Sequence, residues 1–246
     1  MPRVLKLIAG VLISVLVLAF AAFVIYVQVA TYPPEQEQLA AVMADDSLSI
    51  TEERQYYKII PATQDTTQPH IIYYPGGLVD PGAYLYKMGA AARELKTTVY
   101  IIKAPFNAAI FNVGAAGKII DSYGLEQAWV GGHSLGGISA CRFAARNPES
   151  VYGVFMFGSY CDQNLAGFAG PVVVVIGLND LIINRENYEA AKANLPRETR
   201  IFEVNELNHS DFGNYGLQEG DAPGVLSDSE VIEIITAAFT ESLIID

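Results

Sequence analysis

The sequence predicts a doubly wound α/β fold with a mostly parallel sheet, preceded by one N-terminal transmembrane helix. Short apolar runs alternate with helical stretches along most of the chain. Several of these runs are continuously apolar, as in strands that are buried on both faces of a parallel sheet. A long uncharged segment opens the chain. Alternation of this kind implies right-handed crossovers between parallel strands.

The elements follow one another in regular order. The predicted strands are Arg54–Ile60, His70–Tyr74, Thr98–Lys103, Ala128–Gly131, Val151–Phe157, Pro171–Ile176 and Arg200–Val204. The predicted helices are Ala83–Leu95, Ala108–Tyr123, Leu135–Arg146, Asn184–Asn194 and Ser229–Leu243. A polar helix or spacer is expected over Glu35–Asp46, before the first strand.

The N-terminal segment predicts a membrane anchor. Residues 7–29 are almost wholly apolar, and as a helix they would be roughly 34 Å long, enough to cross a bilayer. A cleavable signal peptide is the alternative, because residues 19–21 resemble a cleavage site, but the apolar run continues past them. Basic residues precede the run and acidic ones follow it, so the remainder is expected on the extracytoplasmic side. We therefore expect a signal anchor over residues 1–34 and an α/β domain over residues 35–246.

The charge balance restricts the partners. The formal net charge is −12, and after Lys6 the chain carries 13 basic and 27 acidic side chains. Such a surface repels phosphate backbones, so nucleic acid is not an expected partner. We expect the two cysteines, Cys141 and Cys161, to be either buried small side chains or a disulfide. No zinc-site spacing is present, and the sequence does not define an oligomeric state.

One short motif predicts chemistry. Gly132-x-Ser134-x-Gly136 has the pattern of a nucleophile elbow, with an apolar strand before it and an alanine-rich helix after it. A serine in such a tight turn has a strained backbone, and side chains two residues away on either side would collide. The turn directs the helix N-terminus toward an anion formed at the serine. Ser134 is the predicted nucleophile.

A serine hydroxyl needs a base, and three histidines are available. His133 lies within the elbow and is interpreted as a packing or polar support residue. His70 begins a strand, at the edge opposite the one where ligands bind in such sheets. His209 follows the last predicted strand, and it is the predicted base.

An acid must orient that base. Asp180 follows a buried strand and is the first choice, with an Asx turn or helix cap as its alternative role. Asp162, after the preceding strand, and Asp211, two residues beyond His209, are competitors.

The oxyanion of an acyl-transfer intermediate needs backbone donors, each typically worth roughly 3–4 kcal/mol. The N–H of Leu135, directly after the nucleophile, is one by position. The second is expected in the glycine-containing loop after the strand at residues 70–74, from Gly77 or Leu78.

With these motifs together, the chain resembles the α/β-hydrolase superfamily, and more narrowly the membrane-anchored bacterial α/β-hydrolase fold-5 family. The matching stretches are residues 74–81, 103–107, 131–137, 177–180 and 208–213. The resemblance implies a triad of Ser134, Asp180 and His209 that hydrolyses an ester or related acyl bond through an acyl-enzyme. This chemistry requires no cofactor or metal, and it implies a small-molecule acyl substrate.

Many relatives carry a helical cap after the strand that ends at Phe157. Only a short loop follows here, so a minimal cap or none is expected. Tyr160, Phe168 and Phe212 are the candidate walls of an open pocket, together with residues 214–224. A non-catalytic interaction module at the membrane is the alternative function. A carboxymethylenebutenolidase-like enzyme would usually have a cysteine in place of Ser134.

Overall fold

A computed structural model describes residues 3–242, and they form two separate units. The first, Met1–Thr31, consists of helix α1 (Arg3–Ala30). Within α1, the 26 residues Leu5–Ala30 have a mean hydropathy of 3.0 and are long and apolar enough to cross a membrane. A signal sequence meets the same two criteria. The second unit, Tyr32–Asp246, holds the α/β domain.

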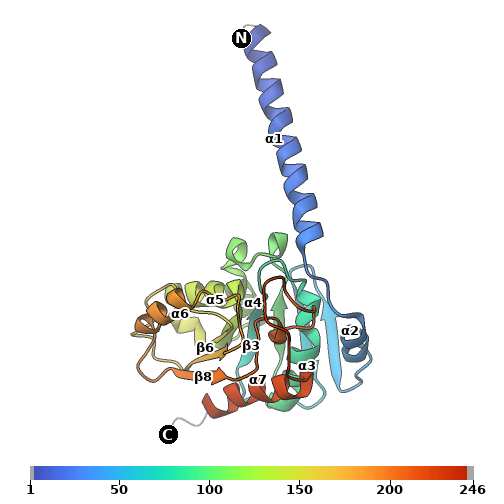
Figure 1. Ribbon diagram of the computed structural model, residues 1–246. Helices are drawn as coiled ribbons and strands as arrows, with labels where there is room; N and C mark the ends of the chain where they lie inside the picture. Colours follow the sequence, from blue (N-terminus) through green and yellow to red (C-terminus); the bar gives the residue numbers. More distant parts are fainter. Residues whose placement is uncertain (1–2, 243–246) are drawn as a thin grey trace. The chain divides into compact units, whose positions relative to one another are not determined.

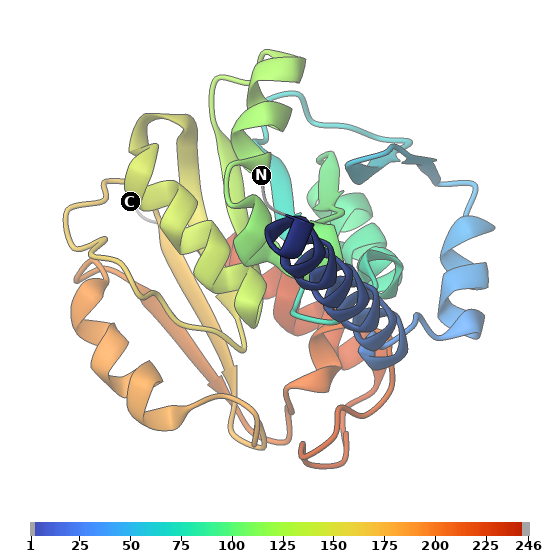
Figure 2. The same ribbon diagram turned by 90° about the horizontal axis from the view of Figure 1, so that it is seen from above.

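The domain is built on one sheet of eight strands (Figure 1). The strands are β1 (Leu48–Glu52), β2 (Tyr56–Pro61), β3 (His70–Tyr74), β4 (Val99–Ile102), β5 (Ala128–His133), β6 (Val151–Phe157), β7 (Val172–Gly177) and β8 (Arg200–Val204). Their order is β1-β2-β4-β3-β5-β6-β7-β8. β1 and β2 at one side and β8 at the other are well separated in Figure 2. β1 and β2 pair antiparallel, as do β2 and β4, and the pairs from β4 onward are all parallel. The carboxyl ends of β3 to β8 therefore share one edge of the sheet.

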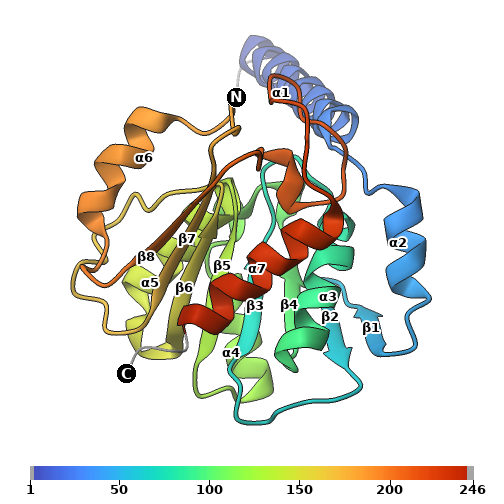
Figure 3. The ribbon, with the colours of Figure 1, turned by 60° about the horizontal axis from the view of Figure 1, so that its bottom comes forward.

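Helices cover both faces of the sheet, as Figure 3 shows. They are α2 (Gln36–Met43), α3 (Leu85–Leu95), α4 (Ala115–Tyr123), α5 (Leu135–Arg146), α6 (Arg185–Ala191) and α7 (Asp228–Ser242). Short 3₁₀ helices are η1 (Pro81–Tyr84), η2 (Pro105–Asn107), η3 (Ala109–Asn112), η4 (Pro148–Ser150), η5 (Lys192–Asn194) and η6 (Ser210–Phe212). One core lies under α4, α5 and α6, and the other lies under α2, α3 and α7.

Burial of the central strands explains why the positions of the strands could be predicted from the sequence. Every residue of β4, β5 and β7 is buried, so these strands are continuous apolar runs apart from glycines and His133. All seven predicted strands match β2 to β8 within two residues at each end, and Arg54–Ile60 corresponds to β2. The prediction missed β1, an edge strand whose residues are all exposed or half-buried and therefore have no continuous apolar pattern.

Two helix predictions need correction or qualification. The helix expected over Ala108–Tyr123 is divided, because η3 ends at Asn112 and α4 begins only after Gly114. The last helix begins at Asp228 as α7, and Leu243, its expected end, lies outside the described residues.

The expected absence of a large cap agrees with the loop between β6 and β7. Residues 158–171 contain no helix. Cys161 in this loop forms a disulfide with Cys141 of α5, with a Cα–Cα distance of 5.5 Å. The disulfide ties the loop to the helix that begins at the elbow, and it decides between the two readings of the cysteines.

Candidate active site

Ser134 lies in the sharp turn between β5 and α5. Its φ of 52° and ψ of −122° are rare for a residue with a side chain. The turn is fixed from both sides: the Ser134 N–H donates to the Phe157 carbonyl at 2.9 Å, and the Ser134 carbonyl accepts from Ser159 Oγ at 2.6 Å. The serine side chain is half-buried at the carboxyl edge of the sheet.

The two glycines of the motif allow this turn. A Cβ on Gly132 would lie 2.1 Å from the carbonyl oxygen of Tyr74, and one on Gly136 would lie 2.0 Å from the same atom. Both distances are far inside van der Waals contact, so neither position accepts a side chain. The spacing therefore reflects packing of the elbow against the end of β3.

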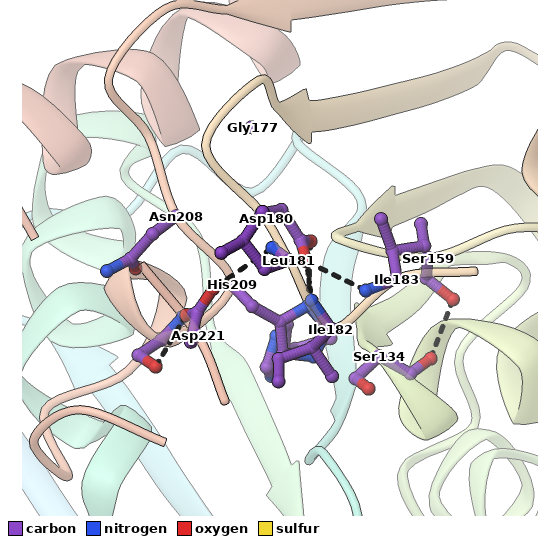
Figure 4. A network of polar contacts seen from close by, with 12 residues as sticks. Ser134, Ser159, Gly177, Asp180, Leu181, Ile182, Ile183, Asn208, His209 and Asp221 are labelled. Atoms are coloured by element: carbon purple, nitrogen blue, oxygen red, sulfur yellow. Dashed lines mark hydrogen bonds and ion pairs between the residues drawn. The ribbon is translucent and has the colours of Figure 1, made fainter. Parts of the chain in front are cut away.

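His209 and Asp180 form a buried pair at the same edge. His209 Nδ1 lies 2.7 Å from Asp180 Oδ2, and the residues are 1% and 2% exposed (Figure 4). Asp180 Oδ1 accepts from the N–H groups of Ile182 and Ile183 at 2.9 and 2.8 Å. Because a carboxylate only accepts, the ring proton is on Nδ1 and the lone pair of Nε2 is left for another partner.

His209 and Ser134 line one open pocket of about 210 Å³. His209 Nε2 is buried and has no hydrogen-bond partner among the described residues. No hydrogen bond to the Ser134 hydroxyl is formed among them either, and such bonds are often long before a substrate binds. The remaining lining residues are Leu135, Ile138, Gly158, Ser159, Tyr160, Ile182, Ile183 and Asn184. The pocket lining thus combines apolar side chains with the Ser134 hydroxyl and the His209 imidazole.

Gly158 brings β6 close to the buried pair. Its φ is +50°, and a Cβ there would lie 3.1 Å from His209 Nδ1 and 3.3 Å from Asp180 Oδ2. The position therefore needs glycine both for its backbone angle and for the space that the pair occupies.

The two competing acids have other partners. Asp162 accepts two hydrogen bonds from Arg142 Nε and one from its Nη2, at 2.5–3.2 Å. Asp211 Oδ2 accepts from the Asn208 N–H at 3.0 Å, and burial raises the pKa of this carboxyl. Asp180 is thus the acid in contact with His209.

The loop after β3 approaches the elbow. A Cβ on Gly77 would lie 3.2 Å from the Leu135 side chain, so Gly77 and Leu135 are neighbours. The Leu78 N–H already donates to the Asn107 carbonyl at 2.8 Å, which makes Leu78 a poor second donor. Gly77 has no such bond among the described residues. Leu135 is the first residue of α5, where N–H groups have no acceptor within the helix.

His133 supports the site from behind. It is fully buried, and its Nδ1 lies 2.9 Å from the hydroxyl of Tyr84, which accepts from the Gly76 N–H at 3.0 Å. Burial, and then the electrostatic effect of the neighbouring His209, hold the pKa of His133 well below its usual value, so the ring is neutral. His70, half-buried at the start of β3, is at the opposite edge, as predicted.

Two of the three pocket walls expected from the sequence are wrong. Phe168 lines a different hollow, with Tyr152 and Pro148, because the loop from β6 must return to the opposite edge before the parallel strand β7 begins. Phe212 is 1% exposed and stacks on Phe157 behind His209. Tyr160 does line the pocket.

Sequence reasoning missed Ile138, Ile182 and Ile183 as pocket walls, and it missed Tyr84. Ile182 and Ile183 lie two and three residues after Asp180, and their N–H groups donate to its carboxylate, so the spacing from Asp180 is a usable signal. Tyr84 carried no signal, because its role depends on contacts with residues distant in sequence.

The sheet, the strained serine after β5 and the histidine after β8 are those of an α/β hydrolase. Residues 70–233 match the model of Abhydrolase_5, described as the alpha/beta hydrolase family. The chain belongs to this family. No curated protein matches it.

Solved structures share the fold at low identity. Carboxylesterase CesB of Bacillus subtilis has a TM-score of 0.58 at 14% identity, over 83% of this chain and 95% of that one. A bacterial membrane phospholipase A has 0.61 at 14%, over 96% and 99%. A putative lipase from Acinetobacter baumannii has 0.61 at 13%, over 85% and 96%. At such identities the likeness concerns the fold.

Proposed function

We propose that this protein is a serine hydrolase that cleaves an ester or related acyl bond through Ser134, His209 and Asp180. The observation that carries the proposal is the free Nε2 of His209. It belongs to a ring fixed by Asp180 at 2.7 Å and borders the pocket that holds the strained Ser134. A nucleophile, a base with an available lone pair and an acid that orients the base are the groups that acyl transfer needs.

In the first half-reaction Ser134 Oγ attacks the acyl carbon and forms a C–O bond. His209 Nε2 takes the hydroxyl proton and then gives it to the leaving group as the bond to that group breaks. Asp180 remains ionised and stabilises the protonated ring. Water then attacks the acyl carbon of the acyl-enzyme, and His209 Nε2 takes a proton from the water. His209 gives that proton to Ser134 Oγ as the bond between the acyl carbon and Oγ breaks, and the carboxylic acid product leaves.

Charge develops on the carbonyl oxygen in both steps. The N–H groups of Leu135 and Gly77 are the proposed donors to it, since Gly77 lies beside Leu135 and the Leu78 N–H is already bound to Asn107. Donors fixed in advance stabilise the oxyanion without reorganisation in the transition state.

We propose in addition that α1 remains attached as an uncleaved signal anchor and that the catalytic domain, residues 35–246, is extracytoplasmic. Arg3 and Lys6 precede the apolar run, while Glu35 and Glu37 follow it. The disulfide between Cys141 and Cys161 is consistent with an oxidising compartment. Among the solved structures of similar fold are a carboxylesterase, a putative lipase and a membrane phospholipase A, and these names support an ester substrate.

The test is hydrolysis of a series of p-nitrophenyl esters by the full chain in detergent, with fluorophosphonate labelling in parallel. Ser134→Ala is expected to lose both turnover and labelling. Ser150→Ala, at the opposite edge of the sheet, is the matched control and should keep both. If the wild-type protein neither turned over esters nor took the label, the non-catalytic interaction module would replace this proposal.

A further inference from the structure

Large apolar side chains are exposed on the loops at the carboxyl edge of the sheet. Phe111, Leu181 and Leu217 are 61%, 67% and 53% exposed, and Phe106 and Ile110 are each 37% exposed. We call these five residues the apolar rim. They follow β4, β7 and β8, whose carboxyl ends lie at the same edge as Ser134. Single exposed apolar residues are ordinary, whereas their concentration at one edge indicates a contact surface.

Hydrogen bonds fasten the rim loops to the candidate active site. We call the loop after β3, which carries Gly77 and Leu78, the oxyanion loop. The Asn107 carbonyl, beside Phe106, accepts from the N–H of Leu78 in this loop. Leu181 directly precedes Ile182 and Ile183, which line the pocket. The N–H of Gln218, next to Leu217, donates to Ser210 Oγ, one residue from His209. Each of the three rim segments is therefore joined, by a hydrogen bond or by direct sequence adjacency, to a segment of the candidate active site.

Tyr32, the first residue of the second unit, is bound into the same loops. The Tyr32 N–H donates to the Leu78 carbonyl at 2.8 Å, and the Tyr32 carbonyl accepts from the Asp80 N–H at 3.0 Å. The Tyr32 hydroxyl accepts from the Glu219 N–H, in the segment that carries Leu217. The candidate membrane span ends at Ala30, so only Thr31 separates it from this fixed residue. By chain length alone, the tether is at most about 7 Å, whatever its direction.

The chemistry of the rim fits a neutral bilayer surface. Its five side chains are aliphatic or aromatic, and the chain after Lys6 carries 27 acidic against 13 basic residues. A domain of that charge is repelled by anionic lipids, so apolar insertion, not polybasic attraction, would hold it to the interface.

We propose that the apolar rim lies in the interface of the bilayer that α1 spans, and that the pocket at Ser134 takes the acyl chain of a neutral or zwitterionic lipid ester from that bilayer. The substrate half of this inference rests on the serine hydrolase function proposed above. Four of the ten residues that line the pocket are aliphatic, Leu135, Ile138, Ile182 and Ile183, and they suit an acyl chain that enters past the rim.

The kinetic test uses the full chain reconstituted in dioleoylphosphatidylcholine vesicles that contain dioleoylglycerol. Release of oleate is compared with hydrolysis of soluble p-nitrophenyl acetate by the same preparation. For Phe111→Ser/Leu181→Ser we expect the ratio of the two rates to fall at least tenfold. Met43→Ser/Ile201→Ser, with exposed residues on α2 and at the start of β8, is the matched control and should keep the wild-type ratio.

An unchanged ratio in the rim variant would overturn the inference while the esterase function stood. So would hydrolysis of the soluble ester by the wild-type protein with no release of oleate from the vesicles. Absence of both the soluble activity and the fluorophosphonate label in the wild-type protein would instead refute the proposed serine hydrolase function.

A binding measurement tests the rim without catalysis. Trp129 is 2% exposed and gives a constant background. In the full chain in brominated phosphatidylcholine vesicles, Leu181→Trp should show a blue-shifted emission that the lipid quenches. Ile201→Trp, at the other edge, should emit as in water. Equal emission and quenching for the two tryptophans would refute the membrane contact.

Discussion

At the scale of single residues, the strained backbone of Ser134 is held by hydrogen bonds and by close packing of the backbone around it. A residue with a side chain at φ 52° and ψ −122° costs of order 1–3 kcal/mol. The Ser134 N–H and carbonyl are both hydrogen-bonded, and Gly132 and Gly136 press against Tyr74. The turn thus holds the hydroxyl at the pocket in advance of any ligand, which spares the reaction an ordering cost.

Asp180 and Asp162 give a matched pair of acids for the first prediction. Asp180→Asn should lower kcat on a soluble ester by roughly 10³–10⁴-fold, because an amide stabilises the wrong ring tautomer of His209. Asp162→Asn should leave kcat within about twofold, since Asp162 binds Arg142 on the protein surface. Steady-state kinetics of both variants is the measurement, and the reverse order of effects would transfer the role of acid to Asp162.

Tyr84 is predicted to be a positioning residue for the oxyanion loop. Burial raises the pKa of Tyr84 and lowers that of His133, so the phenol stays protonated and donates to the neutral ring while it accepts from Gly76. Tyr84→Phe removes both hydrogen bonds, and kcat should fall about tenfold, equivalent to about 1.4 kcal/mol, with little change in KM.

The control for Tyr84 is another buried tyrosine. The hydroxyl of Tyr73 is buried and has no hydrogen-bond partner among the described residues, so Tyr73→Phe removes no such contact. Equal losses of kcat in the two variants would assign the effect to packing, and the positioning role would be wrong.

At the scale of elements, an ion pair between the buried Lys87 and the half-buried Asp228 joins α3 to the start of α7. Lys87 Nζ lies 2.6 Å from Asp228 Oδ1 and donates to the Gly213 carbonyl at 3.1 Å. Lys87 is 2% exposed, and burial lowers its pKa against the opposing effect of Asp228. The pair therefore fixes the segment after His209 between the two helices, where loss of one partner leaves the other charge buried.

The pH dependence of this contact follows from Asp228. Burial opposes its ionisation, but the hydrogen bond and charge of Lys87, with hydrogen bonds from Asn214 and Gln38, together outweigh burial and hold the folded-state pKa of Asp228 below 3.8. Its stabilisation is therefore complete well above pH 3.8 and is lost as the pH falls through the lower, folded-state value.

Asp228→Asn should therefore lower the free energy of unfolding by about 2 kcal/mol near neutral pH, and the difference from wild type should shrink below about pH 4. Urea unfolding of both proteins across this range is the measurement. Asp121→Asn, on the exposed side of α4, is the control and should change little at any pH. A difference between Asp228→Asn and wild type that grew on acidification would contradict the assignment.

At the scale of the whole molecule, much of the fold was predictable because burial on two faces leaves a clear trace in sequence. Continuous apolar runs identified β4, β5 and β7. Residues that follow parallel strands lie at one edge of the sheet, and this predicted Ser134, Asp180 and His209 as neighbours. The prediction that Phe168 lines the pocket was wrong because a loop between parallel strands runs from one edge of the sheet to the other. The composition of the loop does not predict which edge each of its side chains is near.

Other features had no sequence signal because they depend on long-range backbone contacts. Tyr32 bonds to residues 78 and 80 through main-chain groups, which any side chain would permit. The contact of Tyr84 with His133 joins residues 49 positions apart. Such contacts can be proposed only when the structure brings the segments together.

The segment after the span is predicted to be part of the catalytic unit, and two truncated chains test this. Residues 32–246 keep the Tyr32 hydrogen bonds to Leu78 and Asp80, whereas residues 36–246 lack them. Both chains should fold, because every buried residue of the two cores lies beyond residue 36. We expect kcat on a soluble ester to be about tenfold lower for the shorter chain, since the oxyanion loop loses a neighbouring strand segment worth roughly 1–2 kcal/mol.

Tyr32→Ala in the longer chain separates backbone from side chain. It keeps the two main-chain hydrogen bonds and removes the contact of the hydroxyl with the Glu219 N–H and the contact of the ring with Tyr215. Because the oxyanion loop is held by the main-chain bonds, its kcat should stay near that of the longer chain. Equal kcat for the two truncated chains would show that the oxyanion loop holds its shape unaided. The link at Tyr32 would then serve only to fix the domain close to its anchor, and its effect should appear with lipid in vesicles and not with a soluble ester.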